Sequence, residues 1–432
     1  MKRPLAIVLF VVVLAPALAP AQDKKDADKK DKKKRDEPGL EGLKALKNAD
    51  PEVRYKAAAV MVRLGPVAKF ASAELREAFK EEKDLGVKVK MAEAVWAVDR
   101  PPPSVLTPFL IEALKAKAPA VRMEAAGVLG QMGAKAKAGT PALIRVLKDK
   151  DDAVRIAAIA ALGEIGPVAK EAAEPLLDAI QEKNKDLLID TMVAAALGKL
   201  GPDVVPLLVK TVEEASGRRR LAAVYALGEI GAPAAKGTEA LIKVLKQKDN
   251  LEHLFAVQAL GKIGPAAKAA AATVRPLLKA KDDGLRLEAA LTLHLLTKES
   301  ETLPIVFEYL SDEKRGLTYE AALALKQFGT AGKEATARLK KLMEHRDFNI
   351  RLAAGVALWS VTGKAEETLK LYGATIDNSD NAIRRRTLEY LLEMGPAARP
   401  LTPLIQEAGR DEDDGVRNLA RAVLARLATE KP

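Results

Sequence analysis

The sequence of 432 residues contains no cysteine, three histidines and few aromatic residues, which make up 4% of the chain. The absence of cysteine excludes disulfide bonds, thiolate metal sites and a thiol nucleophile. The histidines, His253, His294 and His345, are scattered, and an acidic residue follows none of them. Phosphate-binding loops, dinucleotide-binding glycine patterns and nucleophile elbows are also missing. We therefore predict a non-enzymatic protein with no catalytic residue, no cofactor and no metal site.

Long hydrophobic runs are equally scarce, and the longest lies near the N-terminus. Lys2 and Arg3 precede an apolar stretch over residues 5–14, and Ala19-Pro20-Ala21 offers small residues for cleavage. This order predicts a signal peptide over residues 1–21 and export to the periplasm or the extracellular space. The alternative is an uncleaved anchor, although the apolar stretch is shorter than the roughly 20 residues of a spanning helix. We expect no membrane span in the mature chain.

Residues 22–39 lack large apolar side chains and consist mainly of lysine and aspartate. Such a segment has too little apolar surface to form a core. We interpret it as a charged, disordered tether that precedes the folded part. The alternative is a contact arm for anionic surfaces, which its small excess of basic residues favours only weakly.

The rest of the chain, residues 40–430, repeats one pattern about twelve times. The clearest copy runs from Asp151 to Pro167 and contains Val154 as its anchor residue. Equivalent anchors are spaced 30 to 35 residues apart, at Val53, Val87, Val121, Ile189, Arg219, Glu252, Leu285, Leu317, Ile350, Ile383 and Val416. A fixed period of this size is typical of a solenoid, in which each unit buries its apolar face against its neighbours.

Each anchor lies near the start of a predicted helix. Aspartate stands three residues before the anchor in nine copies, where its carboxylate can cap the first turn: Asp50, Asp84, Asp151, Asp186, Asp249, Asp282, Asp347, Asp380 and Asp413. Apolar residues follow at helical spacing, and glycine ends the helix in eight copies. A shorter helix precedes each turn, and proline suits its first turn at Pro108, Pro141, Pro206, Pro304 and Pro403.

The turn aspartate, the Val154-Arg155 pair and the Ala157-Ala158 to Leu162-Gly163-Glu164-Ile165-Gly166 run resemble the HEAT-repeat family, in the short bacterial form and in the phycobilisome-lyase type. The resemblance implies an all-α, right-handed α-solenoid of about twelve two-helix repeats. It also implies a protein that binds other macromolecules. No residue of this chain matches a chromophore-handling residue. A lyase-like role therefore stays an alternative that only the resemblance of the repeats supports.

A basic residue follows the anchor in nine copies, including Arg122, Arg155 and Arg384. These residues either pair with turn aspartates of adjacent copies, which we favour, or form a ladder for phosphates. The formal net charge is +11, of which +7 belongs to the repeats. This modest charge makes nucleic acid an unlikely partner, although Arg218-Arg219-Arg220 and Arg384-Arg385-Arg386 keep polyanion binding open as an alternative.

The last copy predicts which face of the anchor helices is free. Asn418 and Arg421, two and five residues after the anchor, replace residues that are apolar or small elsewhere, as expected of a terminal repeat. Positions three, six and ten should then form the free face on the inner curve. In copies five to ten these positions hold our predicted protein-binding residues: Met192, Tyr225, Phe255, Leu291, Leu295, Leu323 and Val356.

Two interpretations of these seven residues remain open. They either line an apolar groove for a protein or peptide, or tight curvature buries them against neighbouring helices. If the seven residues line such a groove, the sequence predicts an exported, monomeric scaffold without catalytic activity, which binds its partner there.

Overall fold

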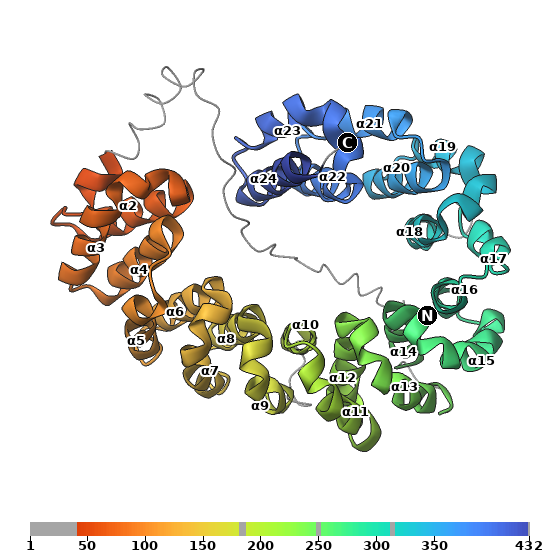
Figure 1. Ribbon diagram of the computed structural model, residues 1–432, viewed down its shortest axis with the longest axis horizontal. Helices are drawn as coiled ribbons and strands as arrows, with labels where there is room; N and C mark the ends of the chain where they lie inside the picture. The colour runs from red at the N-terminus through yellow and green to blue at the C-terminus, as the bar shows by residue number, and fades with distance from the viewer. Residues whose placement is uncertain (1–40, 181–186, 248–251, 312–315, 431–432) are drawn as a thin grey trace. The chain divides into compact units, whose positions relative to one another are not determined.

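The computed structural model describes residues 41–180, 187–247, 252–311 and 316–430, and every regular element in these ranges is helical. Their contacts define two compact units, an N-terminal unit up to Glu299 and a C-terminal unit from Ser300 (Figure 1). The predicted signal peptide and tether lie outside the described residues. The all-α prediction is confirmed, and each unit consists of two-helix repeats packed in sequence order.

Each predicted anchor falls on a helix or next to its start, and we call these the second helices of the repeats. In the N-terminal unit they are α2 (Pro51–Leu64), α4 (Leu85–Asp99), α6 (Pro119–Gln131), α8 (Asp152–Ile165), α10 (Leu187–Lys199), α12 (Gly217–Ile230), α14 (Glu252–Ile263) and α16 (Asp283–Thr297). In the C-terminal unit they are α18 (Thr318–Phe328), α20 (Phe348–Thr362), α22 (Asn381–Met394) and α24 (Asp414–Thr429).

Shorter first helices alternate with them: α3 (Ser72–Glu81), α5 (Pro103–Ala113), α7 (Thr140–Val146), α9 (Ala173–Asp178), α11 (Val205–Glu214), α13 (Thr238–Leu245), α15 (Ala271–Val274), α17 (Leu303–Glu308), α19 (Thr336–Leu342), α21 (Glu366–Gly373) and α23 (Thr402–Ala408). The sequence pattern did not predict the 3₁₀ turns beside them: η1 (Gly65–Ala71), η2 (Gly133–Gly139), η3 (Gly166–Ala172), η4 (Pro202–Val204), η5 (Ala232–Gly237), η6 (Gly264–Ala270), η7 (Arg275–Lys279), η9 (Gly329–Ala335) and η10 (Gly395–Leu401).

The predicted aspartate caps are present wherever the structure describes them. In each case a carboxylate oxygen accepts a hydrogen bond from a backbone N–H of the first turn, and the caps are Asp50, Asp84, Asp151, Asp282, Asp347, Asp380 and Asp413. Asp186 and Asp249 lie outside the described residues. Each cap satisfies a donor that the helix itself leaves free, and so fixes where the second helix begins.

Left-handed backbone at the end of the second helices explains the predicted glycine stops. Gly166 and Gly201 have φ of 74° and 79°, which costs glycine little because it has no Cβ atom. Where glycine is missing, Arg100 and Lys298 adopt positive φ instead, at 45° and 63°. Their ψ angles of 56° and 10° lie in the left-handed helical region, whereas ψ is −147° at Gly166, so these two helices end in a different turn that costs some backbone strain.

One predicted helix start is wrong. Pro108 lies inside α5, because that helix already begins at Pro103. The three consecutive prolines of residues 101–103 replace the glycine stop and the 3₁₀ turn of other repeats, so the helix starts earlier. The prolines at 141, 206, 304 and 403 do lie in first turns, as expected.

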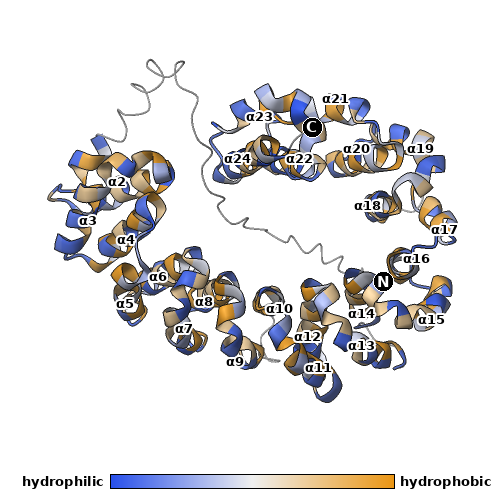
Figure 2. Cartoon of the chain, in the orientation of Figure 1, coloured by the Kyte–Doolittle hydropathy of each residue, from blue (hydrophilic) through white to orange (hydrophobic). Residues whose placement is uncertain are grey.

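The second helices pack side by side within each unit, and small residues set their close approach. A Cβ atom added at Gly163 would lie 3.0 Å from Cα of Ala196, and one at Gly228 would lie 2.9 Å from Cα of Ala259. Hydrophobic and hydrophilic residues alternate along the helices, as amphipathic helices require (Figure 2). In α4 the equivalent position holds Trp96 instead of glycine. The Trp96 side chain is buried, and its indole N–H donates to the carbonyl of Gln131 at 3.2 Å.

The predicted polar end of the last repeat is present. Asn418 and Arg421 are both exposed on α24, the last helix that the structure describes. This exposure supports the orientation of the second helices that was inferred from the sequence.

Candidate functional site

The structure separates the seven predicted binding residues into two groups. In the N-terminal unit Met192, Tyr225, Phe255, Leu291 and Leu295 are half-buried on α10, α12, α14 and α16. In the C-terminal unit Leu323 is half-buried and packs against the core, and Val356 is completely buried. Whether any of them binds a partner stays a prediction.

Val356 is a correction, because a residue without exposed surface cannot line a groove. Side chains from α18 and α22 meet across the intervening α20 that carries it. The hydroxyl oxygens of Tyr319 and Tyr390 are 3.4 Å apart, and Lys326 Nζ lies 2.8 Å from a carboxylate oxygen of Glu393. In this part of the C-terminal unit the second interpretation holds: curvature brings alternate repeats together and covers the helix between them.

A similar closure occurs at the start of the N-terminal unit. The hydroxyl of Tyr55 on α2 donates to Glu124 on α6, across the intervening α4. Lys90 on α4 lies over the ring of Tyr55 at 5.2 Å, and its Nζ is 2.6 Å from Glu93 and 3.7 Å from Glu124. Gln131 donates to Glu93 at 2.8 Å. The polar residues predicted on this face therefore bind one another and link three successive repeats.

From α8 to α16, the side-chain contacts that the structure describes join one repeat to the next, not to the one beyond it. Position ten of successive second helices holds Glu164, Lys199, Glu229 and Lys262. The stems of the last three lie close to Gly163, Gly198 and Gly228 of the preceding helix. Lys199 Nζ lies 2.5 Å from Glu164, and Lys262 Nζ lies 2.5 Å from Glu229. These charges therefore pair within the protein, in repeat-to-repeat couples that flank the half-buried apolar residues.

Tyr225 connects the apolar residues to the charged couples. The ammonium of Lys262 lies 4.9 Å from the centre of the Tyr225 ring, a cation–π contact. Burial, followed by the nearby carboxylate of Glu229, raises the pKa of Tyr225, so its hydroxyl stays protonated and can donate. Met192 and Phe255 pack partly against the core of the unit. We define the inner-face patch as Met192, Tyr225, Phe255, Leu291 and Leu295.

The basic ladder has a structural role in the repeats that show its contacts. Nε and Nη2 of Arg122 each donate to one carboxylate oxygen of Asp149 in the next repeat, at 2.7 Å. Its Nη1 donates to the carbonyls of Ala116 and Lys117, which lie in the turn between α5 and α6 of its own repeat. Arg384 binds Asp411 in the same way, so the predicted pairing between adjacent copies is confirmed for Arg122 and Arg384. In both pairs the aspartate that binds the arginine is not the one that caps the helix. It lies two residues before the capping aspartate. Arg155, Arg286 and Arg417 instead pair with an aspartate of their own repeat.

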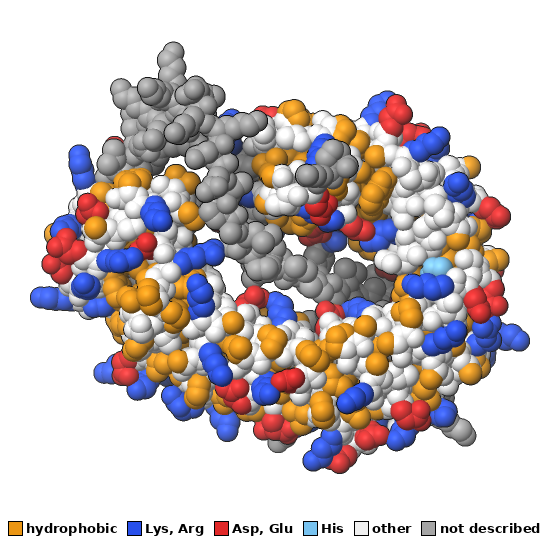
Figure 3. All heavy atoms as spheres, viewed as in Figure 1, with side chains coloured by type: hydrophobic (Ala, Val, Ile, Leu, Met, Phe, Trp, Pro, Cys, Tyr) orange, Lys and Arg blue, Asp and Glu red, His pale blue; other side chains and the backbone are white. Residues whose placement is uncertain are grey.

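The two arginine clusters are paired as well. Arg218 contacts Asp190, Arg219 contacts Glu174 and Asp178, and Arg220 lies 2.7 Å from Glu252. In the second cluster Arg384, Arg385 and Arg386 pair with Asp411, Asp413 and Glu389. Figure 3 shows basic and acidic side chains interspersed on the surface. This matching of charges argues against a phosphate-binding surface at either cluster.

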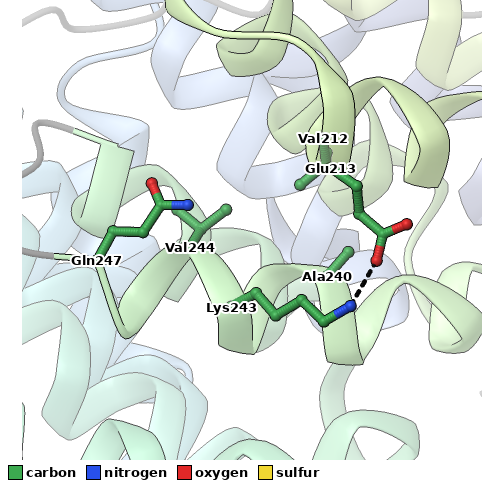
Figure 4. A pocket seen from close by; sticks show the side chains of 6 residues that line it. All are labelled: Val212, Glu213, Ala240, Lys243, Val244 and Gln247. Atoms are coloured by element: carbon green, nitrogen blue, oxygen red, sulfur yellow. Dashed lines mark hydrogen bonds and ion pairs between the residues drawn. The ribbon is translucent and has the colours of Figure 1, made fainter.

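A recess of about 320 Å³ lies between the first helices α11 and α13 (Figure 4). Lys243 Nζ and a carboxylate oxygen of Glu213 form an ion pair across it at 2.7 Å. The lining is Val212, Glu213, Ala240, Lys243, Val244 and Gln247. Because its charged side chains already pair with each other, the recess is a weaker candidate than the inner-face patch.

The adjacent acids Asp282 and Asp283 have structural partners too. Asp282 caps α16 and Asp283 pairs with Arg286 at 2.6 Å. Within the described ranges, no three histidine or acidic side chains gather as a metal ion would need.

In the described ranges, no single helix is long and apolar enough to cross a membrane. Only the bent pair Leu188–Lys199 and Pro202–Glu214, at 109°, reaches the required length and composition together.

The family follows from comparison with known sequences. The HEAT repeats family matches residues 107–193, 238–326 and 277–359, and the PBS lyase HEAT-like repeat matches residues 219–247. Together these matches cover more than half of the chain, which belongs to the HEAT-repeat proteins. No match was found among curated proteins.

Solved structures with a similar fold include the complex of CpcE and CpcF of phycocyanin lyase from Nostoc sp. PCC7120. It is 22% identical, with a TM-score of 0.40, over 61% of this chain and 92% of that chain. The karyopherin Kap121p, bound to the extreme C-terminus of the protein phosphatase Cdc14p, is 14% identical, with a TM-score of 0.39, over 91% of this chain and 50% of that chain. This chain thus spans half the length of Kap121p. At these identities the likeness concerns the fold alone.

Proposed function

We propose that this HEAT-repeat protein is an exported scaffold without catalytic activity, which binds a protein or peptide segment on its inner-face patch. The observation that carries the proposal is the contrast along the second helices. Side chains of alternate repeats meet over α4 and over α20, whereas the described contacts over α10 to α16 leave five large apolar side chains partly exposed.

The chemistry of the patch suits recognition of another chain. Aromatic residues such as tyrosine and phenylalanine are enriched at the centres of interfaces, and tyrosine is common among the residues that carry most of the binding energy. The couples Glu164–Lys199 and Glu229–Lys262 form a polar rim with matched charge. An apolar patch with a polar rim is the usual composition of a protein-binding surface.

A display selection of random peptides against the purified chain tests the proposal. Peptides enriched on the native protein should lose binding to Tyr225→Ala and Phe255→Ala, while the melting temperature changes little. Phe70→Ala is the matched control, because Phe70 is 47% exposed on η1, away from the second-helix face.

Two results would contradict the proposal. One is equal loss of binding in the Phe70→Ala control, which would show that the peptides bind elsewhere. The other is a sharp loss of stability in both patch variants, of about 3–5 kcal/mol, which would mark Tyr225 and Phe255 as core residues.

A further inference from the structure

Glu288 differs from the other acidic residues on the same face. Glu164 and Glu229 each have a lysine ammonium at 2.5 Å. The carboxylate of Glu288, on α16, instead accepts a hydrogen bond from the neutral amide of Gln258, on α14, at the long distance of 3.4 Å. The neighbouring repeats therefore satisfy Glu288 much less well than they satisfy the other two acids.

Burial makes this weak pairing costly. Glu288 is half-buried, and removing a carboxylate from water is unfavourable unless a cation or strong donors compensate. Burial accordingly raises the pKa of Glu288. Lys262 attracts the carboxylate from a distance, but its ammonium is bound by Glu229 and lies over the ring of Tyr225.

The residues around Glu288 fit a long side chain with an apolar stem. Phe255 lies one turn before Gln258 on α14, and Leu291 lies one turn after Glu288 on α16, so each shares a helix face with its neighbour. Both are half-buried members of the inner-face patch. An acid beside apolar surface matches the structure of lysine and arginine, which cover apolar surface with their stems and keep a charged end group.

We propose that Glu288 and Gln258 form a subsite for a lysine or arginine side chain of the bound segment, with Phe255 and Leu291 against its stem. This inference rests on the proposed function and specifies the partner: a segment that presents a basic residue beside apolar ones. Arginine should be preferred, because its planar end group can bind the carboxylate through two hydrogen bonds and still lie flat on the Phe255 ring.

Two short synthetic peptides test the subsite directly. The probes are acetyl-Leu-Arg-Leu-Phe-amide and the same peptide with citrulline, a neutral isostere of arginine, titrated into the full chain by NMR. The arginine peptide should bind about tenfold more tightly than the citrulline peptide. Glu288→Gln should remove that preference. The control is Glu213→Gln, whose acid pairs with Lys243 between the first helices α11 and α13, and this variant should retain the preference.

Each outcome decides the question. Equal affinity for the two peptides, no binding of either peptide, or an arginine preference that survives Glu288→Gln would overturn the subsite. If displayed peptides bind the inner-face patch while the arginine preference is missing, the proposed function stands and the subsite alone fails. If the preference depends on Glu288 but no displayed peptide depends on Tyr225 or Phe255, the general binding surface fails instead.

Discussion

Arg122 on α6 and Asp149 before α8 form a two-bond ion pair that fastens one repeat to the next. Both side chains are nearly buried, at 8% and 12% exposed. The same carboxylate accepts the backbone N–H of Asp151 at 3.0 Å, and Asp151 in turn caps α8. One acidic residue thus positions the turn, the helix start and the neighbouring repeat.

Removal of this acid should destabilise the solenoid. We expect Asp149→Ala to cost about 3 kcal/mol, because the Arg122 charge would stay buried without its partner. Asp152→Ala is the control, since Asp152 is 63% exposed and its pair with Arg155 should contribute less than about 0.5 kcal/mol. Urea unfolding followed by circular dichroism measures both changes. Equal losses in the two variants would contradict the role of the Arg122–Asp149 pair.

The same pair should make stability depend on acid pH. The hydrogen bond from Arg122 holds the pKa of Asp149 below its ordinary value of about 4. A carboxylate with a lowered folded-state pKa stabilises the fold above its unfolded-state pKa, and this contribution is lost as the pH falls through the folded-state value. The stability gap between the native chain and Asp149→Ala should therefore be constant above about pH 5 and shrink below about pH 4. A gap that stays constant down to strongly acid pH would refute the linkage.

Loss of a helix cap should have a smaller effect. Asp151 accepts the backbone N–H of Val154 at 3.2 Å, and Asp151→Ala should cost about 0.5–2 kcal/mol. Asp151→Asn keeps an acceptor oxygen and should recover most of the loss. Equilibrium denaturation of the two variants checks this, and an unchanged midpoint for alanine would count against the cap.

The close approach of the second helices should tolerate no added carbon at Gly228. Gly228→Ala places a Cβ atom 2.9 Å from Cα of Ala259, so the helices must shift, and we expect a lower melting temperature. Gly127→Ala is the matched control in α6: no atom lies within 4 Å of its new Cβ, and the helix should gain up to about 1 kcal/mol. If Gly228→Ala is as stable as Gly127→Ala, the contact does not limit helix spacing.

N-terminal processing stays a prediction, because residues 1–40 lie outside the described part of the chain. The basic start, the apolar run and Ala19-Pro20-Ala21 predict cleavage before Gln22. Mass spectrometry of the protein purified from its native source should find Gln22 at the N-terminus, as glutamine or as its cyclised form. A native chain that still begins at Met1 would refute cleavage.

The sequence by itself determined the repeats and their helices. Capping by Asp151 and reversal at Gly166 are local effects, since each depends on residues within one turn of the helix end. Their regular recurrence therefore predicted where most second helices begin and end. Asn418 and Arg421 of the last copy also predicted the free face, because they replace residues that are apolar or small in the other copies.

Only the tertiary structure decided which residues on that face are accessible. Leu291 and Val356 occupy the same repeat position, yet Leu291 is partly exposed and Val356 is buried beneath side chains from α18 and α22. The weak pairing of Glu288 was equally hidden, because it depends on which side chain the adjacent repeat places opposite it. Periodicity fixes the face on which a residue lies, whereas exposure depends on local curvature and on contacts between residues more than sixty positions apart.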